Sequence, residues 1–305
     1  MTFLGISSTV ATLAVLVAGF LRNRRALLPP YGWIALAALV LAELLMFRRI
    51  EPVATYFTPI AWTAYILLAD AAVWAITRHS RLRDHPLQLA QMALLSIPLW
   101  LVFEAYNLHL ANWIYVGVPT RWYWNLVGYG WSYATITPAI FETADLVETF
   151  GWFPSTSPKN ISSTVKRGMV AFGAISLILP LILSRPSASY LFALVWIGFV
   201  FLLEPINHRL HLPSLLGDLE AGRQSRLYSL LAAGWVCGWL WEFWNYWAAA
   251  KWYYIFPLFQ RWKIFEMPAL GYLGFLPFSL ECFVMYVSAK GMLKKVSGRM
   301  VERRT

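Results

Sequence analysis

The stretch TFLGISSTVATLAVLVAGFL (Thr2–Leu21) contains twenty residues and no charged side chain. A helix rises about 1.5 Å per residue, so this stretch is long enough to cross about 30 Å of hydrocarbon. No basic residue precedes it, and an arginine cluster follows it at Arg22–Arg25. A cleavable signal peptide has the opposite charge arrangement. The stretch is therefore predicted to be a permanent membrane-spanning helix.

Similar apolar stretches recur along the whole chain, which is 59% hydrophobic and 13% charged. Soluble domains have about 25% charged residues. Five further stretches are long enough to cross a bilayer: 53–77, 87–108, 123–148, 226–249 and 264–289. Three stretches of about 16 residues only just reach that length: 32–47, 168–184 and 189–204. We predict an all-α, polytopic membrane bundle of about nine spans.

The net charge of +10 is distributed unevenly between the two sides of this bundle. With nine spans, 18 of the 25 lysines and arginines fall in the loops and tail on one side, and seven fall on the other. The positive-inside rule then places the N-terminus outside and the C-terminus in the cytoplasm. We expect an integral protein of a bacterial inner membrane that has no nucleic-acid partner. Whether it forms a homo-oligomer is not predicted.

Two segments of the chain repeat one another. The first reads FEAYNLHLANWIYVGVPTRW (103–122) and the second WEFWNYWAAAKWYYIFPLFQRW (241–262). Their glutamates, asparagines, tryptophans and tyrosines match at a nearly fixed offset of 138 to 140 residues. The apolar stretches follow the same offset, which indicates two tandem four-helix units of equal orientation. The predicted parts are an N-terminal extra span with a basic loop (1–31), a first repeat (32–150), a polar linker (151–166), a second repeat (167–289) and a basic tail (290–305).

The repeat places four carboxylates inside predicted spans. Ionisable side chains are costly in hydrocarbon and mark functional sites by default. We predict catalytic roles for Glu104, Glu142, Glu242 and Glu281, turned toward a chamber between the halves. Two further acids, Glu43 and Asp70, have no counterpart in the other half. The alternative is that the repeated carboxylates only hydrogen-bond between helices.

Asparagines and aromatic residues accompany these acids. Asn107 and Asn245 lie three residues after a glutamate, on the same helix face, where the amide can donate to the carboxylate. Aromatic rings beside an acid suit protonation of a C=C bond, because they stabilise the resulting carbocation. Packing of bulky side chains explains the same rings equally well. The predicted substrate-binding residues are Asn107, Asn245, Tyr133, Tyr272, Trp131, Trp239 and Trp241.

Several kinds of chemistry have no signature in this chain. No predicted span contains a lysine for a retinal Schiff base, and no histidine cluster, DDxxD pair, Walker loop or GxSxG motif occurs. Cys237 and Cys282 lie inside spans and read as small buried hydrophobes. Glu204, His208 and His211 could approach a metal ion, but at the rim of a span they are more often solvated. We predict neither a cofactor nor a metal.

The segments GFLPFSLECF (274–283) and TPAIFE (137–142) resemble the membrane lycopene cyclase and carotenoid-hydratase type of family, which carries Pro-x-x-Glu-like motifs in duplicated halves. WLWEFWNY (239–246) resembles the Trp-Glu motif of fungal integral-membrane terpene cyclases. The cyclase motif usually ends in paired acids, whereas Cys282 follows Glu281 here. The resemblance implies metal-free, redox-neutral acid–base chemistry on a polyene.

The favoured hypothesis is a membrane-embedded enzyme that cyclises or hydrates an isoprenoid or carotenoid-type lipid through carboxylates. The alternative is a proton-coupled transporter or lipid-handling protein with its site between pseudo-symmetric halves. A third hypothesis is a non-catalytic scaffold, for which the interface between the halves would be closed.

Overall fold

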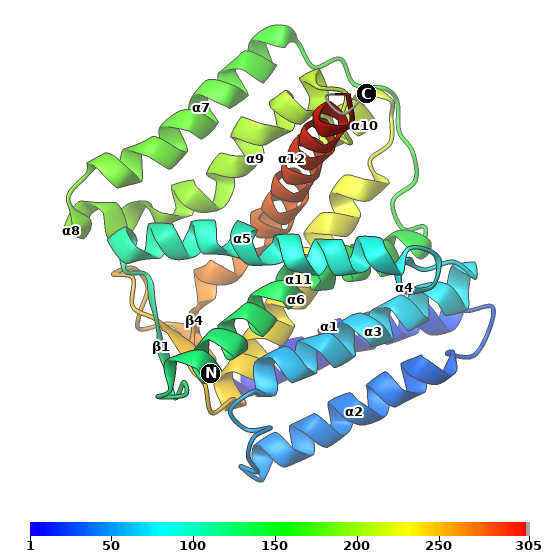
Figure 1. Cartoon of the computed structure of the whole chain (residues 1–305), viewed down its shortest axis with the longest axis vertical. Coiled ribbons are helices and arrows are strands. Elements are labelled where there is room, and N and C mark those ends of the chain that lie inside the picture. Colours follow the sequence, from blue (N-terminus) through cyan, green and yellow to red (C-terminus); the bar gives the residue numbers. More distant parts are fainter. Residues whose placement is uncertain (303–305) are drawn as a thin grey trace.

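The computed structural model describes the backbone of residues 1–302 and the side chains of residues 1–295, and it is mostly helical (Figure 1). Helices occupy all nine predicted positions. They are α1 (Thr2–Asn23), α2 (Pro30–Phe47), α3 (Phe57–Thr77), α5 (Pro86–Leu110), α6 (Trp122–Thr149), α7 (Ser163–Ile182), α9 (Phe192–Arg209), α11 (Ser225–Trp247) and α12 (Phe275–Glu302). The last helix therefore continues into the predicted basic tail, of which residues 303–305 lie outside the described residues.

Seven helical segments are long and apolar enough to cross a membrane. They contain α1, α2, α3, α5, α7, α9 and α12, so the three shortest predicted spans all qualify. The two remaining helices, α6 and α11, are 28 and 23 residues long and cross the middle of the molecule (Figure 1). This composition is that of an all-α helical membrane protein.

Short elements connect the long helices. They are α4 (Arg81–Asp84), α8 (Arg185–Ala188), η1 (Ser189–Leu191), α10 (Leu215–Glu220), η2 (Ala269–Gly274), β1 (Trp113–Val116), β2 (Lys251–Tyr254), β3 (Lys263–Ile264) and β4 (Met267–Pro268). The predicted span at 264–289 is wrong in its first eleven residues, which form the end of β3, a two-residue turn, β4 and η2. Pro268 and the glycines that follow it disfavour a regular helix in this part of the chain.

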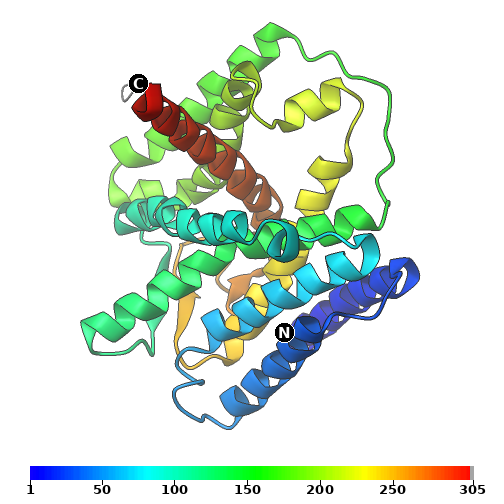
Figure 2. The same ribbon diagram turned by 45° about the vertical axis from the view of Figure 1, so that its right-hand side comes forward.

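The two loops that share the repeated sequence pair as an antiparallel ladder. In β1 and β2, Trp113 lies opposite Tyr254, and Tyr115 lies opposite Trp252. Ile114 lies opposite Tyr253 at the centre. The all-α prediction contained no such ladder, because four-residue strands leave only a weak signal in an apolar sequence. The ladder joins the connection between α5 and α6 to the segment that follows α11 (Figure 2).

Close helix contacts are made through small residues. Gly173 of α7 lies against the backbone of α9 at Gly198 and Leu202. Gly234 of α11 lies against the backbone of α12 at Phe275. Such contacts let two helices approach closely where the hydrophobic effect cannot drive their association.

Asp70 and Glu204 make equivalent contacts in different parts of the chain. Asp70 on α3 accepts a hydrogen bond from the backbone N–H of Leu82 at 2.9 Å. Glu204 on α9 accepts one from the backbone N–H of Leu216 at 2.9 Å. The two acids are 134 residues apart, and so are the two leucines. Asp70 therefore does have a counterpart, which the sequence comparison missed because the offset differs and an aspartate matches a glutamate.

A charge cluster lies at the ends of α6 and α11 farthest from the ladder. Arg81 contacts Glu142, with 3.3 Å between Nε and Oε1, and also pairs with Asp145. Arg226 of α11 pairs with Glu148 at 3.1 Å and approaches Asp145 at 3.7 Å. Glu142 is fully buried, so its charge depends on Arg81 for compensation.

Removing only the cation of this cluster is expected to destabilise the protein. Arg81→Met leaves Glu142 buried without a partner and should lower the free energy of unfolding by about 3 kcal/mol. The double variant Arg81→Met/Glu142→Met should recover most of that loss, because no buried charge remains. Unfolding in a mixed-detergent titration measures both values. Equal losses in the single and double variants would contradict this assignment.

Candidate functional site

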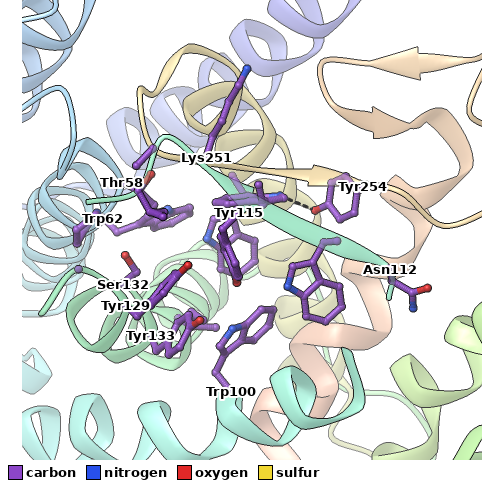
Figure 3. Close-up of a pocket in the computed structure, with 18 of the residues that line it drawn as sticks. Thr58, Trp62, Trp100, Asn112, Tyr115, Tyr129, Ser132, Tyr133, Lys251 and Tyr254 are labelled. Atoms are coloured by element: carbon purple, nitrogen blue, oxygen red, sulfur yellow. Dashed lines mark hydrogen bonds between the residues drawn. The ribbon is translucent and has the colours of Figure 1, made fainter. Parts of the chain in front are cut away.

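A pocket of about 190 Å³ lies beneath the β1–β2 ladder (Figure 3). Its walls come from α3, α5, α6, α9, α11, α12 and both ladder strands, and therefore from both predicted repeats. The lining is mainly aromatic. Its tryptophans and tyrosines are Tyr56, Trp62, Trp100, Trp113, Tyr115, Tyr129, Tyr133, Trp196, Trp241, Trp252 and Tyr254.

Matched residues of the two segments face this pocket together. Trp113 and Tyr115 line it from β1, and Trp252 and Tyr254 line it from β2. Deeper in the bundle, Trp62 of α3 and Trp196 of α9 are also lining residues, 134 positions apart. The prediction of site residues omitted both of these tryptophans. The 134-residue offset that also relates Asp70 to Glu204 is the signal that could have found them.

Glu104 of α5 lies behind the wall of the pocket and is held by three donors. Its Oε1 accepts hydrogen bonds from Tyr115 Oη at 2.5 Å, Trp100 Nε1 at 2.8 Å and Trp113 Nε1 at 3.3 Å. All three donors are lining residues. The carboxylate is therefore separated from the pocket by the side chains that bind it.

Glu242 of α11 has fewer partners. Its Oε1 accepts a hydrogen bond from Tyr254 Oη at 2.8 Å, and its Oε2 has no hydrogen-bond partner among the described residues. Trp252 Nε1 donates to the oxygen of Tyr254 at 2.9 Å. Glu242 is fully buried. As at Glu104, a tyrosine stands between the carboxyl group and the pocket.

Asn107 and Asn245 hold the ladder strands and do not contact the carboxylates. Asn245 Nδ2 donates to the carbonyl of Trp252 at 2.9 Å, and its Oδ1 accepts from the N–H of the same residue at 2.9 Å. Asn107 makes the same two bonds to Trp113, at 2.9 and 3.2 Å. The predicted amide-to-carboxylate bond is thus replaced by a clamp between helix and strand. The clamp fixes the tyrosine two residues further along.

The two tyrosines keep their protons over a wide pH range. Burial, with the neighbouring Glu104 carboxyl group, raises the pKa of Tyr115 well above its usual value. Burial and the Glu242 carboxyl group do the same to the pKa of Tyr254. Both groups lie on the ladder strands, outside the long helices. Each hydroxyl can therefore donate a proton at one moment and accept one at the next, which suits a relay.

The other two predicted catalytic acids lie away from this pocket. Glu142 belongs to the charge cluster with Arg81, and Glu281 on α12 accepts a hydrogen bond from the backbone N–H of Phe199 at 3.3 Å. None of the four predicted carboxylates is itself among the residues that line the pocket. The expected shared chamber therefore brings together Glu104 and Glu242, through their tyrosines, and does not include Glu142 or Glu281.

Some of the predicted aromatic residues line the pocket, and others lie outside it. Tyr133 and Trp241 line the pocket. Trp239 and Tyr272 stack on each other outside the lining, with ring centroids 4.1 Å apart. Trp131 is exposed and donates to Thr63 Oγ1 at 2.9 Å. Lining residues and outward-facing residues cannot be told apart from composition alone.

The region around Glu204 does not assemble a metal site. Glu204 Oε1 accepts from Ser214 Oγ at 2.6 Å, and His208 Nε2 lies 2.9 Å from Glu220. Among the side chains of residues 1–295, no group of three or more His, Cys, Asp or Glu is placed to hold a metal ion. These residues instead fasten α9 to α10.

No family model matches the chain, and neither do the curated proteins or the solved structures that were compared with it. The resemblance to membrane lycopene cyclases and terpene cyclases therefore stays a prediction.

Release of the clamp should loosen its strand without disturbing the bundle. Asn245→Ala removes both bonds to Trp252, at a cost of about 2 kcal/mol. We expect amide hydrogens in a peptide covering 250–255 to exchange roughly 10- to 100-fold faster, as read by mass spectrometry. Asn160→Ala, in the exposed linker, is the control and should leave this peptide unchanged. Unaltered exchange in Asn245→Ala would show that the two hydrogen bonds of Asn245 do not hold the strand in place.

Proposed function

We propose that this protein is a membrane-embedded enzyme that acts on an isoprenoid or carotenoid-type lipid by carboxylate acid–base chemistry. The observation that carries the proposal is the pairing of Tyr115 with Glu104 and of Tyr254 with Glu242 at the wall of one aromatic pocket. Acids that reach an apolar pocket through hydroxyl groups can move protons where water is scarce.

The size of the pocket favours the end group of a long lipid. An engineered protein cavity of about 150 Å³ takes up benzene, whereas sites for drug-sized ligands measure about 300–1,000 Å³. At about 190 Å³, this pocket suits a six-membered ring with a few methyl groups. Isoprenoid end groups have this size. The remainder of a carotenoid-length chain would extend out of the pocket toward the lipid.

Aromatic walls and a relayed proton suit a reaction that begins with protonation of a C=C bond. A proton added to a terminal C=C bond forms one C–H bond and leaves a carbocation, which the surrounding ring faces stabilise. In cyclisation, a second C=C bond attacks this carbon, a C–C bond forms, and a neighbouring C–H bond gives its proton back. In hydration, water adds and gives up a proton instead. Neither route needs an oxidant or a reductant.

Membrane topology and duplication belong to the same proposal. We place α6 and α11 across the membrane as well, which makes nine spans with the N-terminus outside and the ladder at the outer surface. A pseudo-two-fold axis through the ladder then relates the two tandem four-helix units to each other. Ile114 and Tyr253 support this arrangement, because these two residues, 139 positions apart, lie directly opposite each other. The equivalent contacts of Asp70 and Glu204 support it further.

The resemblance to cyclases agrees with this proposal at one of its two motifs. The Trp-Glu motif corresponds to Trp241, which lines the pocket, and to Glu242 behind it. The Pro-x-x-Glu-like motif leads to Glu281, which is bonded to α9. We therefore assign the chemistry to Glu104 and Glu242, and a packing role to Glu281.

Loss of the carboxyl group at position 242 should abolish turnover. Glu242→Gln keeps the shape of the side chain but cannot exchange a proton, so we expect a fall in rate of about 10²- to 10⁴-fold. Lycopene, an acyclic polyene, in nanodiscs is the probe, and liquid chromatography with mass spectrometry detects isomerised or hydrated products. Glu148→Gln, in the charge cluster, is the matched control. Full activity of Glu242→Gln would refute the role of this acid.

A proton-coupled flux in proteoliposomes, with the lipid recovered unchanged, would instead favour the transporter alternative. The same purified protein serves both measurements.

Filling the pocket should prevent lipid binding. Gly274 lines the pocket, and a Cβ atom there meets no atom within 4 Å, so Gly274→Leu projects into free space. We expect at least a tenfold weaker retention of a polyene, or ~1.4 kcal/mol. Gly130→Leu is the control, because Gly130 also has free space around it but does not line the pocket. Equal retention in both variants would mean that the lipid binds elsewhere.

A further inference from the structure

We propose that the two tyrosine–glutamate pairs have different roles, so that Tyr254 with Glu242 delivers the proton and Tyr115 with Glu104 removes it. The inference rests on the proposed function for its chemistry. Its structural basis is independent of the substrate: the two carboxyl groups occupy matched positions of the repeated segments but differ in hydrogen bonding and in burial, since Glu242 is fully buried and Glu104 is partly buried.

The hydrogen bonds at Glu104 suit a carboxylate anion. Three donors, from Trp100, Trp113 and Tyr115, converge on Oε1. Donors that point at an oxygen stabilise negative charge on it and leave no room for a hydrogen atom there. A tyrosine that already donates to an anion can accept a proton on its own oxygen while it passes its hydrogen to the carboxylate. This pair is therefore arranged as a base.

The surroundings of Glu242 suit a neutral carboxylic acid. One hydroxyl contacts Oε1, Oε2 has no partner among the described residues, and the side chain is fully buried. The two lysines on this side of the pocket are occupied, because Lys251 pairs with Glu266 at 2.9 Å and Lys263 donates to the carbonyl of Tyr254 at 3.2 Å. An anion at Glu242 would lack the donors that Glu104 has.

Trp252 supports the pair of Tyr254 and Glu242 as the proton donor. Its Nε1 donates to the oxygen of Tyr254, whose second lone pair can accept the hydrogen of a protonated Glu242. The hydrogen of Tyr254 is then free to turn into the pocket. In β1, the equivalent Trp113 donates to Glu104 directly. The two pairs therefore differ in the acceptor of the tryptophan N–H, which is the carboxylate in one pair and the tyrosine oxygen in the other.

The proposed sequence of steps conserves protons. Tyr254 gives its proton to a terminal C=C bond, whose π electrons form the new C–H bond, and takes the proton of Glu242, which becomes an anion. After the ring has closed, Tyr115 accepts a proton from the carbon next to the cation and passes its own proton to Glu104. The electrons of the broken C–H bond form a new C=C bond and discharge the cation. Glu104 then releases one proton to water and Glu242 takes one from water, which restores both groups.

Infrared spectroscopy of the substrate-free protein tests the charge states without any turnover. The full chain in nanodiscs is compared with Glu242→Gln and with Glu104→Gln by difference spectra. We expect Glu242→Gln to lose a C=O stretching band of a protonated carboxyl group, and Glu104→Gln to lose the antisymmetric stretch of a carboxylate. The thermal unfolding transition shows that each variant is folded.

A second pair of variants tests the role of the tryptophans. Trp113→Phe removes one donor from Glu104 and should shift part of its carboxylate band to the protonated form, whereas Trp252→Phe leaves Glu104 unchanged. The assignment would be overturned if both glutamine variants lost a protonated C=O band or both lost a carboxylate band. It would also be overturned if Glu104→Gln lost the protonated band and Glu242→Gln lost the carboxylate band. The proposed enzymatic function would then survive with the roles shared or exchanged. An inactive protein with the expected bands would instead refute the function and leave the charge states established.

Discussion

The β1–β2 ladder is the constraint on which the candidate site depends. Strand backbone in a membrane protein must satisfy its hydrogen bonds internally or at the surface, and here each strand pairs with the other and is clamped by an asparagine. The clamp acts on both the N–H and the carbonyl of one tryptophan, so the strand can neither slip nor rotate. A slip of one residue would turn Tyr115 and Tyr254 to the opposite side and empty the wall of the pocket.

The same ladder connects parts of the chain that are distant in sequence. It lies opposite the charge cluster of Arg81 and Arg226, so α6 and α11 are fastened to neighbouring elements at both ends. Between these ends, glycines such as Gly234 allow close helix packing. A cavity beneath the ladder can persist because the surrounding helices cannot close over it without breaking one of these contacts.

Much of this architecture could be predicted from the sequence, because length and hydropathy decide what a helix in a bilayer can do. A helix lies at each of the nine apolar stretches, although α12 begins eleven residues into the predicted span at 264–289. The spacing of the repeat also singled out Glu104 and Glu242, whose tyrosine partners line the pocket. The ladder was not predicted, since short aromatic strands look like any apolar loop. Asn107 and Asn245 were recognised as paired but were assigned the wrong partner, because helix spacing places an amide near a carboxylate without excluding a backbone group beyond the helix end.

The acids inside the bundle differ in the donors that reach them and in where those donors lie. Glu142 meets an arginine, Asp70 meets a backbone N–H group and the hydroxyl of Tyr31, and Glu204 meets a backbone N–H group and the hydroxyl of Ser214. Each of these contacts fastens two elements together. Sequence position does not reveal such partners, because they come from other helices. Glu104 and Glu242 are bound mainly by aromatic side chains that also line a pocket, and an aromatic hydroxyl can pass on the proton it receives. Tyr31, the aromatic donor at Asp70, lies outside that lining. The position of the donors at a pocket wall, more than burial itself, therefore supports the proposal that Glu104 and Glu242 carry the chemistry.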